Sequence, residues 1–219
     1  MQTFLDFLAG PARDASRLTI LGDLFDYWAG DDDLADPFNA RIVDALRALS
    51  DSGVMLEFMA GNRDFLIGET FAAAAGLTLL PDPLVREIGG IRTLLTHGDA
   101  LCTDDVDYQR FRAQVRDPAW RSAFLARPLA SRKREIEALR SQSEQEKQNK
   151  PAAIMDVNAA AVAAALAEHD AKAMIHGHTH RQGRYDHAGR TRWVLGDWHP
   201  GRGNALLCDA ARWRWLTIT

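Results

Sequence analysis

Four short apolar segments of the chain each lead into a loop that contains glycine and a side chain able to bind a metal ion. The segments cover residues 18–21, 54–59, 91–96 and 173–175, and the loops that follow contain Gly22-Asp23, Gly61-Asn62-Arg63-Asp64, His97-Gly98-Asp99 and His176-Gly177-His178-Thr179-His180. Their length and their apolar, often β-branched character are typical of buried strands. In open α/β sheets, binding sites form outside the carboxyl ends of the strands. We therefore expect an α/β fold in which these loops converge on one site.

The last of these loops carries two histidines, His178 and His180, that are separated by one residue. Alternate residues of an extended segment point the same way, so both imidazoles can face one point beyond the strand end. Imidazole is the commonest side-chain metal ligand, and this spacing predicts a transition-metal site. The alternative for any one loop is a polar turn with incidental side chains. The recurrence of such loops at four strand ends favours a site.

Composition and charge narrow the class of protein. A chain of 219 residues fits one globular domain with a sizeable core. Its formal net charge of −4 gives no support to a nucleic-acid or polyanion partner. The two cysteines, Cys102 and Cys208, fit a reduced pair in the cytosol. No signal peptide is visible, and the apolar stretches fall short of the roughly 18 residues of a membrane span, so we expect a soluble protein that at most touches a membrane.

Apolar periodicity predicts the remaining elements. Helices are expected near the N-terminus, over residues 37–50 and over residues 157–169. Three strands near the C-terminus, at 192–196, 205–208 and 213–218, are expected to be antiparallel and to close a second sheet. The segment at about 105–150 is rich in arginine and lysine and is predicted to be helical, as an insertion over the site. No repeat or linker divides the chain, so residues 1–219 are expected to form a single domain.

The ordered loops resemble the calcineurin-like metallophosphoesterases, and longer sequences narrow the resemblance to the UDP-2,3-diacylglucosamine diphosphatase branch. The resemblance spans almost all of the chain. The sequences that carry it are Leu21-Gly22-Asp23-Leu24-Phe25, Gly61-Asn62-Arg63-Asp64-Phe65-Leu66, His97-Gly98-Asp99-Ala100-Leu101-Cys102-Thr103-Asp104-Asp105 and Ile154-Met155-Asp156-Val157-Asn158. It implies a four-layer α/β sandwich, with two mixed sheets flanked by helices and a helical cap insertion.

This resemblance also implies an activity and its setting. The expected reaction is metal-dependent hydrolysis of the diphosphate of UDP-2,3-diacylglucosamine to 2,3-diacylglucosamine 1-phosphate and UMP, in lipid A biosynthesis. The expected cofactors are two Mn²⁺ ions per site. The expected location is the cytoplasm, as a peripheral protein on the inner membrane, and neither a nucleic acid nor a protein partner is implied.

The resemblance assigns ligands to the two metal ions. Asn62, His97 and His178 are expected to bind one ion, and His180 the other, with Asp23 as the bridging carboxylate. Asp99 is expected to orient His97, and Asp64 to have a similar supporting role.

One feature of the superfamily is missing. Its members begin with a strand that ends in Asp-x-His and supplies two ligands to the first metal, whereas this chain opens with apolar residues at positions 4, 5, 7 and 8, which predict an amphipathic helix. The interpretations are a start codon placed too far downstream, a truncated chain or a degenerate protein. We expect an incomplete first metal position and impaired activity in this chain.

The resemblance and the chemistry together predict the catalytic and substrate-binding residues. Asp23, Asn62 and Arg63 are expected to be catalytic. Arg63 stands where many relatives carry a histidine, and a fixed cation suits a diphosphate whose leaving group has a second pKa of about 6 and needs little proton assistance. The expected substrate-binding residues are Asn62, Arg63, Asp105, Tyr108, Arg140, Ser143, Lys150 and His178.

The cap should select the substrate. Apolar residues within 117–130, including Phe124 and Leu125, are expected to hold acyl chains, and the basic run Arg132-Lys133-Arg134 to rest on anionic lipid or to form an ordinary solvated face. A soluble-substrate enzyme does not need this apolar insertion. The alternatives are therefore another dinuclear metallophosphoesterase acting on soluble nucleotides or phosphodiesters, or a catalytically inactive metal-binding homologue.

Overall fold

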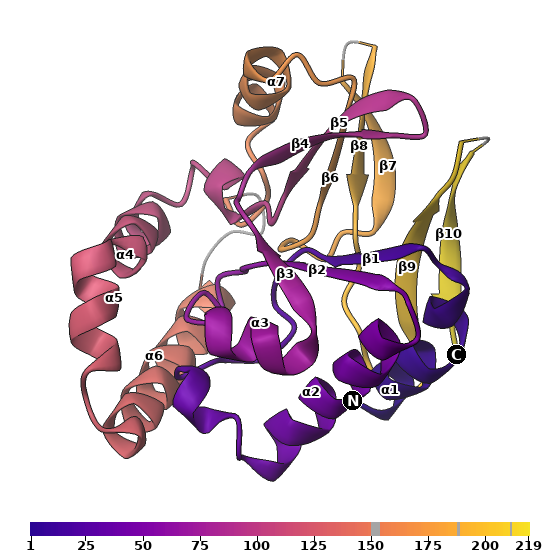
Figure 1. Ribbon diagram of the computed structural model, residues 1–219. Coiled ribbons are helices and arrows are strands. Elements are labelled where there is room, and N and C mark those ends of the chain that lie inside the picture. Colours follow the sequence, from indigo (N-terminus) through magenta and orange to yellow (C-terminus); the bar gives the residue numbers. More distant parts are fainter. Residues whose placement is uncertain (150–153, 188, 211) are drawn as a thin grey trace.

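In the described part of the chain, three hydrogen-bonded sheets form the centre of the molecule (Figure 1). The computed structural model describes residues 1–149, 154–187, 189–210 and 212–219, with all of their side chains except those of residues 142–149. The parallel sheet contains, in order, β1 (Arg17–Ile20), β2 (Met55–Met59) and β3 (Leu77–Leu80). The mixed sheet contains, in order, β4 (Leu84–Ile88), β5 (Ile91–Thr96), β6 (Ala173–His176), β8 (Arg190–Val194) and β7 (Gly183–His187). The antiparallel pair is β9 (Gly203–Cys208) and β10 (Trp213–Ile218).

Helices cover the outer faces of these sheets. The α-helices are α1 (Gln2–Ala9), α2 (Pro37–Asp51), α3 (Glu69–Ala75), α4 (Val106–Arg116), α5 (Pro118–Leu125), α6 (Leu129–Asn149) and α7 (Ala159–Glu168). Short 3-10 helices cover Pro11–Asp14, Asp31–Asp33 and Asp99–Leu101. The helices predicted near the N-terminus and over 37–50 and 157–169 are thus α1, α2 and α7.

Separate apolar clusters define the layers. Alternate side chains of a strand point to opposite faces, so in β2 Phe58 packs with residues of α1, α2 and α3, while Met59 packs between the sheets. In β5, Leu95 joins Met59 between the sheets, whereas Leu94 packs with residues of α7. The order is therefore helices, sheet, sheet, helix (Figure 1). This order confirms the expected four-layer α/β sandwich.

The strands before the four polar loops are confirmed as β1, β2, β5 and β6, but the sequence prediction misses β3, β4 and β7. Strands β3 and β4 are short, only partly buried along most of their length, and joined through Asp82-Pro83. Strand β7 is polar and largely exposed. Of the three C-terminal strands predicted to be antiparallel in a second sheet, β9 and β10 do form an antiparallel pair of their own, but the prediction is wrong for β8, which pairs in parallel with β6. This happens because the antiparallel β7–β8 hairpin turns the chain back beside β6.

The insertion predicted to be helical forms α4, α5 and α6, which stand together at one side of the sandwich and are called the cap helices below (Figure 1). Aspartates start two of them. The Asp105 carboxylate accepts from the backbone N–H of Tyr108 at 3.2 Å, and that of Asp117 accepts from those of Ala119 and Trp120 at 2.9 and 3.0 Å. Such N-caps satisfy backbone donors that the first turn of a helix leaves unpaired.

The basic run at the start of α6 mostly faces the protein, so the prediction of a lipid-facing or solvated surface is wrong for two of its three members. Arg132 is 1% exposed, and its guanidinium binds the backbone carbonyl of Ala29 and the Asp32 carboxylate. Lys133 Nζ lies 2.7 Å from Asp33. The acidic sequence after Gly30 draws these cations inward because it offers carboxylates next to a buried backbone carbonyl.

Among the described residues, no helix combines the length and the apolar character needed to cross a bilayer.

Candidate metal centre

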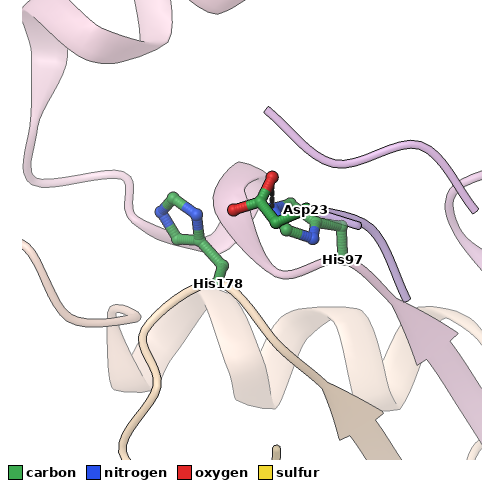
Figure 2. Close-up of side chains that lie close together, drawn as sticks. All are labelled: Asp23, His97 and His178. Atoms are coloured by element: carbon green, nitrogen blue, oxygen red, sulfur yellow. Dashed lines mark ion pairs between the residues drawn. The ribbon is translucent and has the colours of Figure 1, made fainter. Parts of the chain in front are cut away.

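Side chains from the four loops converge as predicted. Asp23 follows β1, Asn62 follows β2, His97 follows β5 and His178 follows β6. Among the described residues, the ligand atoms of Asp23, His97 and His178 gather within 4.8 Å of one another, and Figure 2 shows these three side chains facing a common space. Asp23 and His178 have positive φ angles of 55° and 60°. Non-glycine residues rarely adopt this region, and such strain is concentrated at functional sites.

The Asn62 amide completes this cluster. Its Oδ1 lies 3.0 Å from His97 Nε2 and 2.7 Å from His178 Nδ1. His97 Nδ1 lies 2.7 Å from the Leu21 carbonyl oxygen, which can only accept, so Nδ1 carries the proton and Nε2 keeps a lone pair. That lone pair faces the amide oxygen, which is also electron-rich. Two such atoms are compatible at this distance when a cation lies between them, because adjacent ligands of a six-coordinate ion with bonds of about 2.1 Å lie about 3 Å apart. The donor set therefore fits a divalent metal ion.

Asp64 fixes the geometry of two of these loops. Its side chain is fully buried, and its carboxylate accepts from the backbone N–H groups of Leu24 at 2.7 Å and Gly61 at 2.8 Å. Burial and then the negative charge of Asp23 raise the pKa of Asp64 to about 6, against the opposing effect of the Gly61 N–H. A single carboxylate thus joins the loop after β1 to the loop after β2.

Asp99 does not orient His97, which corrects the sequence prediction, because the Leu21 carbonyl occupies that role. The Asp99 carboxylate instead accepts from Tyr108 Oη at 2.8 Å and from Arg112 Nε at 2.9 Å. Burial acts to raise the pKa of Asp99, but its neighbours His97, Arg116 and Arg112 outweigh it and hold that pKa well below its usual range. Asp99 therefore anchors α4 to the site, and the Tyr108 ring packs on His178 with 5.9 Å between centroids.

His180 lies apart from this cluster. Its Nδ1 faces the Asp197 carboxylate at 3.5 Å, and His199 Nε2 lies 2.8 Å from the same carboxylate. Asp197 was not among the predicted residues, although the pair Gly196-Asp197 follows a strand just as Gly22-Asp23 does. His180 also has a positive φ of 56°, and burial above all lowers its pKa. The position next to Asp197 offers His180 a carboxylate that can fix its ring orientation.

Arg63 lies at the edge of the metal cluster, where the sequence predicts it. Its backbone N–H donates to Asp23 at 3.0 Å, and its guanidinium Nε lies 3.5 Å from the same carboxylate. Its Nη1 donates to Asp26 at 3.0 Å, and Arg140 of α6 lies 3.5 Å from the other Asp26 oxygen. Asp26 is not among the predicted site residues, because it lies outside the strand-end motifs. Two cations from different layers thus meet at one exposed carboxylate.

The predicted substrate-binding residues divide into those that line one cavity and those that lie outside the described residues. Asp105, Tyr108 and Arg140 line a cavity of about 600 Å³ that also contains Asn62, Arg63, His178 and His180. Two of these residues also have a structural role: Asp105 is the N-cap of α4, and Tyr108 donates a hydrogen bond to Asp99. The side chain of Ser143 and all of Lys150 lie outside the described residues.

Apolar cap residues form the far wall of this cavity, but Leu125 is not one of them. Trp120 and Phe124 stack with 4.8 Å between centroids and line the cavity with Val115 and Leu139. Leu125 is 37% exposed and is absent from the lining, because the adjacent position on a helix points about 100° away. Trp120 and Phe124 are therefore placed where an acyl chain could reach them, and that role stays a prediction, whereas Leu125 is not placed there.

Comparisons with known proteins identify the family. The family model for calcineurin-like phosphoesterases matches residues 2–182. The chain is 56% identical over 203 residues to the UDP-2,3-diacylglucosamine hydrolase of Aromatoleum aromaticum, covering 91% of this chain and 82% of that one. It is 50% identical over 204 residues to the hydrolase of the same name from Chromohalobacter salexigens, with the same coverage of 91% and 82%. Among solved structures, Zn²⁺-bound Vps29 from Entamoeba histolytica is 14% identical with a TM-score of 0.47, over 100% of this chain and 88% of that one. The chain belongs to the calcineurin-like phosphoesterase family, in the branch that contains these two hydrolases.

Proposed function

We propose that the chain hydrolyses the diphosphate of UDP-2,3-diacylglucosamine to 2,3-diacylglucosamine 1-phosphate and UMP, a step of lipid A biosynthesis. The observation that carries this proposal is the make-up of one cavity. Metal-type donors and three arginines, Arg63, Arg140 and Arg181, line it together with apolar side chains of the cap helices. A substrate that joins a diphosphate to acyl chains needs both kinds of lining. The two hydrolases that are similar to this chain are named for that substrate.

Divalent cations fit the donor set, and when bound they polarise a phosphate and lower the pKa of an attacking water. Asn62, His97 and His178 would hold one ion together with Asp23. Within the described part of the chain, Asp23 and His180 are the side chains offered to a second ion. The mixture of oxygen and imidazole donors suits Mn²⁺, which we propose as the metal.

Arg63 is the residue best placed to act on the diphosphate. Its guanidinium already lies against two carboxylates, Asp23 and Asp26, and can exchange Asp26 for a phosphate oxygen. Arg140 reaches the same carboxylate from α6 and can take a second oxygen. Charge-assisted contacts of this kind are strong and directional. Asn62 adds no negative charge near this anionic group, because its side chain is neutral.

UMP release in the presence of Mn²⁺ tests the proposal. Purified protein should release UMP from UDP-2,3-diacylglucosamine, and a chelator should stop the release. Arg63→Gln should lower kcat by about 100-fold, as expected for loss of a charge that stabilises the transition state. Arg134→Gln, on the exposed side of α6, is the matched control and should leave kcat unchanged. UMP release that survives both the chelator and the Arg63 change would contradict the proposal.

We also propose that the protein works at the cytoplasmic face of the inner membrane, as a peripheral protein. Two apolar side chains of the cap helices line the cavity and are exposed to solvent, Phe111 at 39% and Leu139 at 37%. A lipid substrate has to enter between such side chains. Cosedimentation with vesicles that contain anionic lipid checks this, and Phe111→Ser should reduce it. Equal sedimentation of both proteins would argue against this surface.

A further inference from the structure

A second cavity of about 500 Å³ shares Phe65 with the first but contains none of the metal donors. Its wall is apolar and comes from the parallel sheet, through Phe58 of β2 with Leu79 and Leu80 of β3. Two arginines of the cap helices, Arg116 and Arg121, complete the lining. The proposed hydrolysis uses no residue that belongs to this cavity alone.

Arg121 is the unusual member of this lining. It is only partly exposed; its backbone N–H donates to the Asp117 carbonyl at 2.9 Å, but its guanidinium makes no hydrogen bond or ion pair with the residues that the structure describes. Burial and then the charge of Arg116 lower its pKa, and Asp31 opposes them only weakly. The Asp31 carboxylate is already committed to Trp28 Nε1 at 3.0 Å and to the backbone N–H of Phe71 at 2.9 Å. A partly desolvated guanidinium that makes no ion pair carries a free-energy cost. Binding of an anion next to Arg121 would reduce that cost.

Arg116 adds a second cation at the same cavity. Its Nη2 donates to the Gly61 carbonyl at 3.1 Å and lies 3.5 Å from Asp99. These contacts fix its position from the side of the metal centre. An anion between Arg116 and Arg121 would relieve their mutual repulsion and give the Arg121 guanidinium its first partner.

We propose that this cavity binds an amphipathic monoanion, a carboxylate on an alkyl chain, with the carboxylate between Arg116 and Arg121 and the chain along β2 and β3. A small inorganic anion would leave the partly exposed Leu79 and Leu80 facing water, and an uncharged alkane would leave the Arg121 guanidinium unpaired. The exposed Glu69 also lines the cavity and disfavours a second negative charge, so a carboxylate is preferred to a phosphate dianion.

Calorimetric titration of decanoate into metal-free protein tests the proposal. Arg121→Gln should weaken decanoate binding by about tenfold or more, as expected for loss of a charged hydrogen-bonding partner. Arg110→Gln is the matched control, because Arg110 lies on exposed α4 and pairs with Asp107 at 3.1 Å outside the cavity. Decyltrimethylammonium and acetate should both bind far more weakly than decanoate, because each lacks one of the two required features.

Decanoate could instead occupy the first cavity, so Leu139→Asp serves as the opposing variant. The proposal requires the Leu139 variant to bind decanoate as the parent does. Weakening by Leu139→Asp without weakening by Arg121→Gln overturns it, and so does the absence of decanoate binding. Arg121→Gln should melt no lower than the parent, since it removes an unpaired cation. Should it unfold, Arg121→Lys replaces it, and binding equal to the parent would again overturn the proposal, because lysine lacks the forked donor pair.

Discussion

Three histidines of the chain differ in role because of the partner at each ring nitrogen. The Nδ1–H of His97 donates a hydrogen bond to the Leu21 carbonyl, and the lone pair on Nε2 faces the metal cluster. His176 is equally buried, but its Nε2 accepts from Arg192 at 3.1 Å and its Nδ1 donates to the Gly177 carbonyl at 2.9 Å. Burial above all lowers the pKa of His176 to about 3, so it stays neutral and structural. His178, two residues later, faces Asn62 instead.

Replacing Asn62 is the sharpest test of the metal centre at the scale of one residue. Asn62→Ala should weaken Mn²⁺ binding by at least about tenfold, because the amide oxygen lies between two imidazole nitrogens and even outer partners of a metal site contribute that much. Electron paramagnetic resonance of free Mn²⁺ measures the affinity directly. His199→Ala, at an exposed histidine outside the cluster, is the control. An unchanged affinity in the Asn62 variant would remove Asn62 from the ligand set.

Sequence alone could predict which side chains converge, and one residue that supports them, Asp64, but not the other supports. Asp23, Asn62, His97 and His178 follow apolar strands, and strand ends on one edge must meet, so their convergence is predictable. Asp26 and Asp197 were not predicted, because a single carboxylate in a loop gives no sign of the arginine or histidine that will face it. The partner of His97 was predicted wrongly for a similar reason: a backbone carbonyl such as that of Leu21 leaves no trace in the sequence.

At the scale of the element, buried polar contacts tie strands of different sheets together. Glu57 lies in the middle of β2 and is 5% exposed. Its carboxylate accepts from Arg86 of β4 at 2.6 Å, from Arg17 of β1 at 2.5 Å and from Thr19 Oγ1 at 2.8 Å. Burial acts to raise the pKa of Glu57, but Arg86, Thr19 and Arg17 outweigh it and lower that pKa. The parallel sheet and the mixed sheet are therefore linked by one ionised carboxylate.

Glu57→Gln should lower the free energy of unfolding by about 2–4 kcal/mol near neutral pH, because it leaves two arginines without their shared anion. A carboxyl whose pKa is lower in the folded state stabilises the fold above its unfolded pKa of about 4.3, and this contribution is lost as the pH falls through the folded pKa. Urea unfolding at several pH values should show the full difference near pH 7 and a shrinking one below about pH 4.3. A difference that grows toward acid pH would contradict the assignment. Glu87→Gln, on β4, is the control.

Sequence periodicity predicts strands that are buried along their whole length and helices with one buried apolar face. It does not predict elements that are only partly buried. Strand β7 is mostly exposed, with Arg184, Tyr185 and Asp186 at its centre, and becomes a strand only through its pairing with β8. The same limit applies to the cap, where neighbouring residues Phe124 and Leu125 looked alike. Phe124 is 3% exposed and Leu125 37% exposed, a difference that only the docking of α5 decides.

These two neighbours provide a matched test of the cap. Phe124→Asp places a charge in the apolar wall, which is costly, and should sharply reduce hydrolysis of the diacylated substrate. Hydrolysis of a small activated phosphodiester needs only the metal centre and Arg63 and should change little. Leu125→Asp should affect neither substrate. Assays of both substrates on one preparation decide between the outcomes: parallel loss in the Phe124 variant would mean that this side chain serves the core and not an acyl chain.

At the scale of the whole molecule, the first cavity exists because the cap helices rest on the sandwich. Part of its lining belongs to the loops after β1 and β2, such as Trp28 and Arg63, and part to the cap helices, such as Phe124 and Leu139. The two parts are joined by the contacts of Arg132 with Ala29 and Asp32 and by those of Lys133 with Asp33. Substrate selection and catalysis therefore depend on ion pairs that touch neither the metal ligands nor the acyl wall.

Arg132→Met should loosen the cap without unfolding the sandwich. The change leaves the Ala29 carbonyl, which is buried, without its donor, and loss of a charged hydrogen bond at such a site costs about 1.5–3 kcal/mol. Hydrogen exchange measured by mass spectrometry should speed up in α5 and α6, while β2 and β5 keep their protection, because local opening follows the stability of each unit. Arg134→Met, whose parent side chain bonds only to Ser131 among the described residues, should exchange as the parent does. Faster exchange throughout the sandwich would show that Arg132 supports the whole fold. The cap helices would then not be a separate unit of local unfolding.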